Sequence, residues 1–176
     1  MYMKASDVEG IVKGKLLRSG HDHVVDNLLT DSRKITHPGS SLFIPLVTAR
    51  RNAHHFLPAV YEAGVRCFLV SDEPDIALYE NAWIIKVDQT LTAMQQLVAW
   101  HRAQFDIPVI GVTGSNGKTI VKEWLYQLLE PDYRVLRSPK SYNSQIGVPL
   151  SVWELKPEYT LAIFEAGISQ AGEMEH

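Results

Sequence analysis

The chain has 176 residues, of which 45% are hydrophobic and 21% are charged, and its formal net charge is −3. A chain of this size can bury a hydrophobic core, either as one ordinary domain or as two small ones. The small net charge and the lack of a lysine or arginine run argue against a nucleic-acid binder and against attachment to an anionic membrane surface. No apolar stretch approaches the ~20 residues of a membrane span, and the N-terminus has charges where a signal peptide would be apolar, so the sequence predicts a cytoplasmic protein.

The first 88 or so residues have the pattern of a small α/β unit. A short apolar run at residues 41–47 contains Pro45, which favours an edge strand or a strand end because proline cannot donate to a sheet. Residues 56–63 show helical apolar spacing closed by Gly64, and residues 65–70 form an apolar run typical of a buried strand. The order strand, helix, strand predicts an α/β fold.

A further strand and a connecting helix follow. Residues 83–87 are a strand candidate, and between residues 89 and 106 apolar residues recur at helical intervals. Asp88 or Thr90 could cap this helix. Cys67, the only cysteine, lies in the apolar run at 65–70, so we expect a buried strand residue and not a nucleophile.

A second unit is expected over residues 107–176. Its pattern is a strand ending at Val112, a glycine-rich loop, a helix at 118–129 and apolar strands at 133–136 and 161–164. This alternation predicts an α/β unit of the nucleotide-binding type. The tryptophans expected to pack on helices are Trp100, Trp124 and Trp153.

The loop of the second unit has the residues of a phosphate-binding loop. Glycines let successive backbone N–H groups point at phosphate oxygens, and the following helix adds its positive N-terminal end. Lys118 would reach the β and γ phosphates of a nucleoside triphosphate, and the hydroxyl of Thr119 would bind Mg²⁺. The match is incomplete, since Val112 stands where the general pattern begins with glycine, and the alternative is a glycine-rich turn with an exposed lysine. The residues predicted to bind the nucleotide are Gly114, Ser115, Asn116, Gly117, Lys118 and Thr119.

Glu165 follows the apolar strand at 161–164. The carboxyl end of a strand near a phosphate loop is where α/β sheets bind their ligands, so this carboxylate could hold Mg²⁺. The alternative is an ordinary solvated acid at a strand end.

His21 and His23 are two residues apart, a spacing that would place two metal ligands on the same face of a strand. The sequence shows no third ligand, so both histidines are better explained as part of a solvated loop.

Several motifs in a fixed order resemble the Mur ligases of peptidoglycan synthesis. The resemblance extends from about Thr30 to the C-terminus, and the first unit is similar to the UDP-sugar-binding domain of one subgroup of that family. The motifs are Asp31-Ser-Arg33, Leu42-Phe-Ile-Pro-Leu46 and Arg50 to Phe56 in the first unit, and Gly114 to Thr119, Lys122-Glu123, Asn143 to Pro149 and Glu165-Ala-Gly167 in the second.

This resemblance implies an α/β architecture with an assigned role for each part. A small N-terminal α/β domain, residues 1–88, would bind the UDP end of the substrate. A connecting helix, residues 89–106, would lead to the first part of a P-loop central domain, residues 107–176, which binds ATP. The loop before His54 departs from the family pattern, because Asn52 stands where an aspartate is usual.

The implied reaction is ATP-dependent amide bond formation with Mg²⁺ as cofactor. The carboxylate of UDP-N-acetylmuramoyl-tripeptide attacks the γ-phosphate of ATP to give an acyl phosphate, and the amine of D-alanyl-D-alanine then displaces phosphate. Lys118 and Glu165 are the implied catalytic residues, and Thr119 and Glu165 the implied metal-binding residues. The residues implied in substrate binding are Ser32, Arg33, Thr48, Arg50, His54, Asn143 and Ser144.

The sequence also raises an expectation about the whole protein. Only about 70 residues of the nucleotide-binding unit are present, whereas α/β domains commonly have ~100 to 200, so we expect an N-terminal fragment that does not turn over substrate alone. The paired His54-His55 and Arg50-Arg51 are similar to a subgroup in which an alanine racemase domain is fused to the ligase.

Two other functional classes remain open at this stage. A nucleotide-binding module without chemistry would need the phosphate loop but neither Glu165 nor the motifs of the first unit. A small-molecule kinase is possible if those motifs are coincidental, whereas a small GTPase would need an Asn-Lys-x-Asp segment that this sequence lacks. Comparing the binding of ADP, GDP and UDP would separate these classes.

Overall fold

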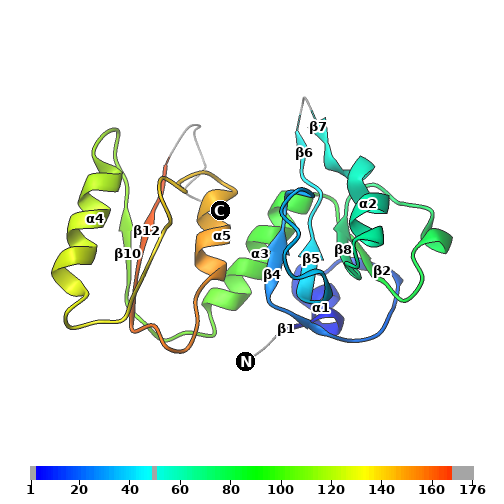
Figure 1. Cartoon of the computed structure of the whole chain (residues 1–176), viewed down its shortest axis with the longest axis horizontal. Helices are drawn as coiled ribbons and strands as arrows, with labels where there is room; N and C mark the ends of the chain where they lie inside the picture. The colour runs from blue at the N-terminus through cyan, green and yellow to red at the C-terminus, as the bar shows by residue number, and fades with distance from the viewer. Residues whose placement is uncertain (1–2, 49–50, 168–176) are drawn as a thin grey trace. The chain divides into compact units, whose positions relative to one another are not determined.

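The structure of the chain is a computed structural model that describes residues 3–48 and 51–167. The chain forms two compact units, one up to Leu97 and one from Val98 onward. Figure 1 traces both units. Every helix in these described ranges is too short or too polar to cross a membrane.

A five-stranded sheet forms the centre of the first unit (Figure 1), in the order β2-β9-β8-β5-β4. β4, β5, β8 and β9 run parallel, and β2 pairs antiparallel with β9 at one edge. The register places Leu42 of β5 opposite both Leu28 of β4 and Cys67 of β8. The strands are β2 (Lys15–Arg18), β4 (Asn27–Leu29), β5 (Ser41–Phe43), β8 (Cys67–Val70) and β9 (Trp83–Lys86).

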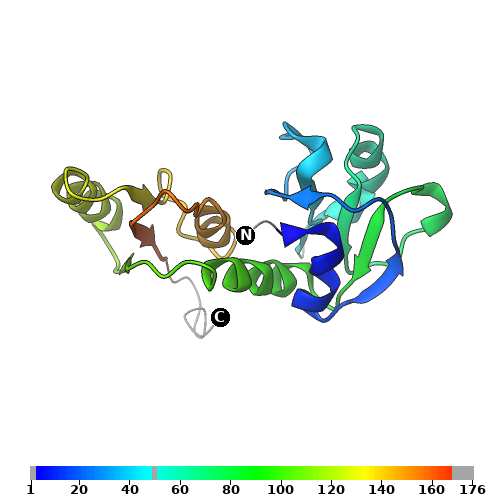
Figure 2. The same ribbon diagram turned by 90° about the horizontal axis from the view of Figure 1, so that it is seen from below.

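Helices and two short strand pairs complete the first unit. Figure 2 shows α1 and α2 on opposite sides of the sheet. The strand pairs are β1 (Met3–Lys4) with β3 (Val24–Val25), and β6 (Val47–Thr48) with β7 (Arg51–Asn52), both antiparallel. The helices are α1 (Ala5–Val12), α2 (Leu57–Glu62) and the part of α3 (Thr90–Arg102) up to Leu97, with 3-10 turns η1 (Pro38–Ser40), η2 (Ala53–Phe56) and η3 (Ile76–Leu78).

Aromatic side chains pack against one another in the core of the first unit. Phe43 and Phe68 are fully buried and meet edge to face, with ring centroids 6.4 Å apart, and Tyr79 lies 5.9 Å from Phe68. All four residues of β8 are buried, because the sheet is covered on both faces. The buried strand predicted at 65–70 is therefore confirmed. Cys67 is buried as expected, and burial raises the pKa of its thiol.

The apolar run at residues 41–47 forms a strand that ends before Pro45, so of the two alternatives drawn from the proline the strand end is right and the edge strand is wrong. β5 lies between β4 and β8 in the sheet and ends two residues before the proline. The missing N–H of Pro45 therefore costs no sheet hydrogen bond, and its carbonyl accepts one from the Thr90 hydroxyl (2.9 Å). The helix predicted at 56–63 is confirmed as α2, and Gly64 beyond it has a φ of +99°, a conformation that favours glycine.

The second unit contains a three-stranded parallel sheet in the order β10-β12-β11. Leu155, Ala162 and Phe164 form its buried core, and Phe105 packs against them from beyond the end of α3. The helix predicted at 118–129 is confirmed, whereas α5 was not predicted. The elements are β10 (Val109–Val112), α4 (Lys118–Leu129), β11 (Val135–Arg137), α5 (Gly147–Trp153) and β12 (Leu161–Glu165).

One face of α4 is apolar and exposed. Ile120, Trp124 and Leu128 follow each other at intervals of four residues, and their exposed fractions are 58%, 64% and 73%. Trp124 therefore lies on a helix, as expected, but does not pack there, whereas Trp153 of α5 is buried.

Candidate nucleotide and metal site

The loop between β10 and α4 has the backbone of a phosphate-binding loop. Gly114 has a φ of +138° and Gly117, which precedes the first residue of α4, has a φ of +76°, so both need the conformational freedom of glycine. Residues 113–117 are exposed. The Lys118 amine donates to the Gly114 carbonyl (2.7 Å), so this lysine bends back over the loop. Its charge thus lies where phosphate oxygens would approach the N-terminus of a helix.

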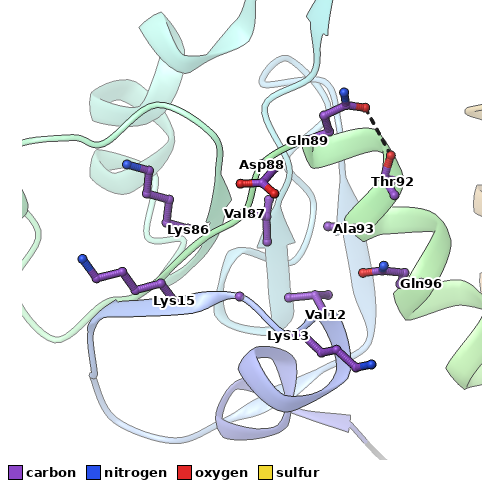
Figure 3. A pocket seen from close by; sticks show the side chains of 11 residues that line it. Val12, Lys13, Lys15, Lys86, Val87, Asp88, Gln89, Thr92, Ala93 and Gln96 are labelled. Carbon is purple, nitrogen blue, oxygen red and sulfur yellow. Dashed lines mark hydrogen bonds between the residues drawn. The ribbon is translucent and has the colours of Figure 1, made fainter.

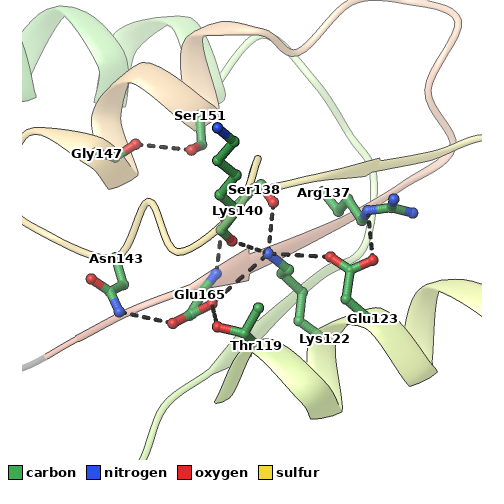
Figure 4. Close-up of polar contacts among 10 residues, drawn as sticks. All are labelled: Thr119, Lys122, Glu123, Arg137, Ser138, Lys140, Asn143, Gly147, Ser151 and Glu165. Atoms are coloured by element: carbon green, nitrogen blue, oxygen red, sulfur yellow. Dashed lines mark hydrogen bonds and ion pairs between the residues drawn. The ribbon is translucent and has the colours of Figure 1, made fainter. Parts of the chain in front are cut away.

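Glu165 lies beside this loop and is buried. The sheet register pairs it with Val112, the last residue of β10, and its exposed fraction is 1%. The Thr119 hydroxyl donates to Glu165 Oε2 (2.8 Å), and the Asn143 amide donates to Glu165 Oε1 (2.8 Å), as Figure 4 shows. The structure therefore brings together three of the predicted site residues, and the alternative of a solvated strand-end acid is wrong.

A fully buried lysine, Lys122, completes this cluster. Its amine donates to the Ser138 carbonyl (2.8 Å) and to the Lys140 carbonyl. It lies 3.8 Å from Glu165 Oε2 and 3.4 Å from Glu123 Oε1. Lys122 occurs within one of the family motifs, but the sequence predicts no role for it. The only available signal was its spacing, since residues 119 and 122 lie on the same side of a helix.

The segment after β11 supplies the other groups around Glu165. Ser138 Oγ accepts from the Glu165 backbone N–H (3.1 Å), and the Asn143 carbonyl accepts from the Gly167 N–H (2.7 Å). A Cβ at Gly167 would lie 2.9 Å from that carbonyl, so this contact requires glycine. Ser144 Oγ accepts from the Gly147 N–H (3.1 Å) at the start of α5. Of the two residues predicted near the peptide substrate, Asn143 faces Glu165, and Ser144 bonds to the first residue of α5.

The cluster has the donor set of a magnesium site. Mg²⁺ prefers oxygen ligands, and one or two protein carboxylates with substrate phosphates are the usual arrangement. Thr119 and Glu165 offer a hydroxyl and a buried carboxylate whose oxygens lie 2.8 Å apart. Within the described residues there is no group of three histidine, cysteine or acidic side chains, so a site made by the protein alone is not indicated.

The predicted substrate residues of the first unit lie where its parallel strands end. Ser32 and Arg33 follow β4, Thr48 follows β5, and His54 contacts the segment after β8. The Arg33 guanidinium holds the Asp31 carboxylate with two hydrogen bonds, of 2.9 and 2.7 Å, and lowers its pKa. This edge of a sheet is where α/β domains bind ligands. Arg50, also predicted to bind substrate, lies outside the described residues.

His54 is held by hydrogen bonds at both ring nitrogens. Nε2 accepts from the backbone N–H groups of Ser71 (3.0 Å) and Asp72 (3.2 Å), and Nδ1 lies 2.7 Å from Asn52 Oδ1. An Nε2 that accepts cannot carry a proton, so the neutral ring has its proton on Nδ1. Burial lowers the pKa of His54, and the nearby Asp72 opposes that shift. The ring therefore ties η2 to the end of β8.

A separate hollow of about 660 Å³ lies in the first unit (Figure 3). It is lined by the turn after α1 and by the segment from β9 into α3, including Lys13, Lys15 and Lys86. The Lys86 amine donates to Glu73 (2.8 Å). None of the described residues predicted to bind substrate lines this hollow.

Comparison with known proteins identifies the class. Residues 112–176 match the family described as the Mur ligase middle domain. The chain belongs to the Mur ligase family.

Within that family, the chain is similar to one kind of enzyme over nearly its whole length. It is 37% identical to the UDP-N-acetylmuramoyl-tripeptide–D-alanyl-D-alanine ligases of Bacillus subtilis and of Escherichia coli, and each alignment covers 96% of this chain and 36% of the relative. The solved D-alanyl-D-alanyl ligase structure of Acinetobacter baumannii matches with a TM-score of 0.85 at 28% identity, over 99% of this chain and 39% of that one. The chain thus spans about a third of the length of the curated relatives it matches.

Proposed function

We propose that this chain is part of an ATP-dependent ligase that joins D-alanyl-D-alanine to UDP-N-acetylmuramoyl-tripeptide. The observation that carries the proposal is the cluster of Thr119, Asn143 and Glu165 beside the phosphate loop. The cluster occurs in a chain that is 37% identical to enzymes named for this reaction. Because the chain spans a third of their length, we propose the activity for a protein that contains this chain.

The loop from Gly114 to Thr119 would bind the phosphates of ATP. Its glycines permit the turn, and its exposed residues leave room for the ligand. The Lys118 amine donates to the neutral Gly114 carbonyl and would donate to a phosphate oxygen of ATP instead. The hydrogen bond to the charged phosphate would be stronger than the one to the carbonyl. Lys118 thus supplies a positive charge beside the transferred phosphoryl group.

Thr119 and Glu165 would hold Mg²⁺. When bound, the metal neutralises phosphate charge as the carboxylate of the peptide approaches. The burial of Glu165 and its bond from Asn143 fix one carboxylate orientation in advance. Positioning and electrostatic stabilisation of this kind supply most of the catalysis in phosphoryl transfer.

The chemistry requires two anions to meet. The carboxylate of the tripeptide attacks the γ-phosphate of ATP, which releases ADP and forms an acyl phosphate. The amine of D-alanyl-D-alanine then attacks the acyl carbon, loses a proton and displaces phosphate to form the amide. The part of the protein in this chain would bind and orient the nucleotide at residues 107–176 through Lys118, Thr119 and Glu165. Asn143 and Ser144, in the same segment, would lie near the peptide.

The first unit, residues 1–88, would recognise the UDP end of the substrate, and residues 89–106 would connect it to the nucleotide site. The supporting observation is that Ser32, Thr48 and the segment held by His54 all follow the carboxyl ends of parallel strands. The Arg33 guanidinium makes two hydrogen bonds to Asp31, which orient it for contact with a uridine or diphosphate group. Arg50 is proposed for the same site on the basis of its motif. Such an enzyme would work in the cytoplasm, where ATP is available.

Titrating the chain with ADP, GDP and UDP, with and without Mg²⁺, tests the proposal. We expect ADP to bind in preference to GDP, with NMR shifts in residues 112–119. UDP should bind at the same time and shift residues 31–54. A kinase or a plain nucleotide-binding module would bind ADP but not UDP. The absence of both binding events would contradict the proposal.

A further inference from the structure

The buried amine of Lys122 links the phosphate-loop helix to the loop that surrounds Glu165. Lys122 lies one helical turn after Thr119, and its exposed fraction is 0%. Its amine donates to two backbone carbonyls, those of Ser138 and Lys140. A buried lysine amine is costly unless it is paired and hydrogen-bonded, and these contacts satisfy that requirement.

The two carbonyls belong to the segment that holds Glu165. Ser138 Oγ accepts from the Glu165 N–H (3.1 Å), and Asn143 donates to the Glu165 carboxylate (2.8 Å). Residues 139–142 connect these two contacts and are exposed, and the start of the segment is held by the buried amine of Lys122 and by the Ser138 N–H, which donates to the Ile163 carbonyl (3.0 Å). At the other end of the segment, Asn143 is held by its own hydrogen bond to Glu165 and by the Gly167 N–H, which donates to the Asn143 carbonyl (2.7 Å).

The same amine also balances charge. It lies 3.8 Å from Glu165 Oε2, and that oxygen also accepts the Thr119 hydroxyl proton (2.8 Å). Glu165 thus has an uncharged donor on each oxygen and a buried cation beside one of them. Glu123 lies 3.4 Å from the amine on the other side and is bonded in turn to Arg137 (3.2 Å). Figure 4 shows these groups converging on the amine of Lys122.

We propose that Lys122 is a positioning residue of the metal site: it fixes segment 138–143 to α4 and thereby orients the Glu165 carboxylate toward Thr119. The inference rests on the proposed function, because it takes Thr119 and Glu165 as the residues that hold Mg²⁺. Lys122 does not touch nucleotide or metal in this account. Its effect on metal binding passes through Glu165.

The test compares Lys122→Met with Lys156→Met, which removes an exposed lysine of the same unit. Calorimetry measures ADP affinity with Mg²⁺ and with a chelator. We expect Lys122→Met to leave metal-free ADP affinity within about twofold and to reduce the gain from Mg²⁺ by tenfold or more, and Lys156→Met to change neither. A full Mg²⁺ gain in folded Lys122→Met would overturn the proposal.

A double-mutant cycle separates positioning from general damage to the fold. In a Glu165→Gln background, Lys122→Met should cause no further loss of the Mg²⁺ gain, because the residue it acts through is already changed. Equal losses in both backgrounds would contradict the proposal. Amide hydrogen exchange gives a readout without ligand: residues 138–143 should exchange at least tenfold faster in Lys122→Met, with β10 unchanged.

A measurement on the unmodified chain covers the case in which Lys122→Met does not fold. The Lys122 ammonium should give a slowly exchanging ¹⁵N–¹H signal, assigned by its loss in Lys122→Arg. That signal should shift with Mg²⁺-ADP and not with ADP plus chelator, and an unresponsive signal would refute the proposal. If the unmodified chain binds no ADP at all, the proposed function fails, while hydrogen exchange at 138–143 still decides the role of Lys122 in holding that segment.

Discussion

Thr119 and Glu165 are 46 positions apart in the sequence, and the hydroxyl of one donates to the carboxylate of the other at 2.8 Å. Parallel pairing of β12 with β10 causes this contact, because it places Glu165 beside Val112 at the point where the phosphate loop begins. The first residues of α4 then lie over the same strand end. The two groups proposed to bind Mg²⁺ are therefore already in contact without it.

Replacing Lys118 should weaken nucleotide binding. Lys118→Ala removes a charge-assisted contact worth ~1.5 to 3 kcal/mol, or about ten- to a hundredfold in Kd. Its only described hydrogen bond within the protein is to the exposed Gly114 carbonyl, so we expect little change in stability. Calorimetry with Mg²⁺-ADP measures the effect, and Lys156→Ala is the control. Unchanged affinity would remove Lys118 from the site.

Glu165→Gln should destabilise the second unit. Lys122 would keep its two carbonyl acceptors and Glu123 but lose the buried carboxylate 3.8 Å from its amine. Breaking a buried pair on one side typically costs ~3 to 5 kcal/mol, and since other partners remain we expect about 2 to 3 kcal/mol. Urea unfolding measures this free energy. Glu154→Gln, at an exposed position, should change it by less than about 0.5 kcal/mol.

Asn52→Asp tests the role of the Asn52 amide, at a position where the family resemblance implies an aspartate. The Asn52 amide donates to Asp72 Oδ2 (2.6 Å), so an aspartate would replace a donor with a second negative charge. We expect a loss of about 1 kcal/mol of stability at pH 7, because Asp72 is exposed and solvent screens the repulsion.

Two controls identify the cause. The loss should shrink on acidification as the carboxylates protonate, and adding Asp72→Asn should restore stability in Asn52→Asp. A loss that persists in the double variant would mean that repulsion between the two carboxylates is not the cause.

The stability of the chain should fall as pH decreases below about 6.5. Burial lowers the folded-state pKa of both His54 and His101 from the ordinary 6.5, so below that pH the unfolded chain binds more protons than the folded chain. Stability is therefore fully present above pH 6.5 and is lost toward the folded-state pKa values. Urea unfolding between pH 5 and 8 should show a shallower slope in His54→Gln, and an unchanged slope would exclude His54 as a source.

Sequence predicts the elements whose signals are local. The strand, loop and helix around Lys118 were identified because an apolar run, glycines and helical spacing occur in succession, and α4 has the expected bounds. The strands before Ser41 were not predicted, since they have two to four residues and show no clear alternation. α5 was missed because it begins at Gly147 and contains Pro149, both of which normally argue against a helix.

The sequence identifies residues of the site, but it does not predict which of their side chains contact one another. Glu165 and Thr119 were identified from position and motif, whereas the burial of Lys122 depends on carbonyls that only the folded chain brings to it. Two residues also make contacts that the sequence does not predict: Ser144 Oγ accepts from the Gly147 N–H, and both ring nitrogens of His54 bond within the protein. The domain boundaries and a following racemase domain stay predictions.

The exposed face of α4 has a practical consequence for solubility. Ile120, Trp124 and Leu128 present an apolar stripe to water, and such stripes favour self-association as protein concentration rises. Leu128 lies almost three turns from the phosphate loop, so a charge placed there should improve solubility without disturbing the nucleotide site. The fluorescence emission of Trp124 would shift to shorter wavelength as the stripe becomes covered. Tryptophan fluorescence therefore offers a way to monitor the aggregation of this chain without an added dye.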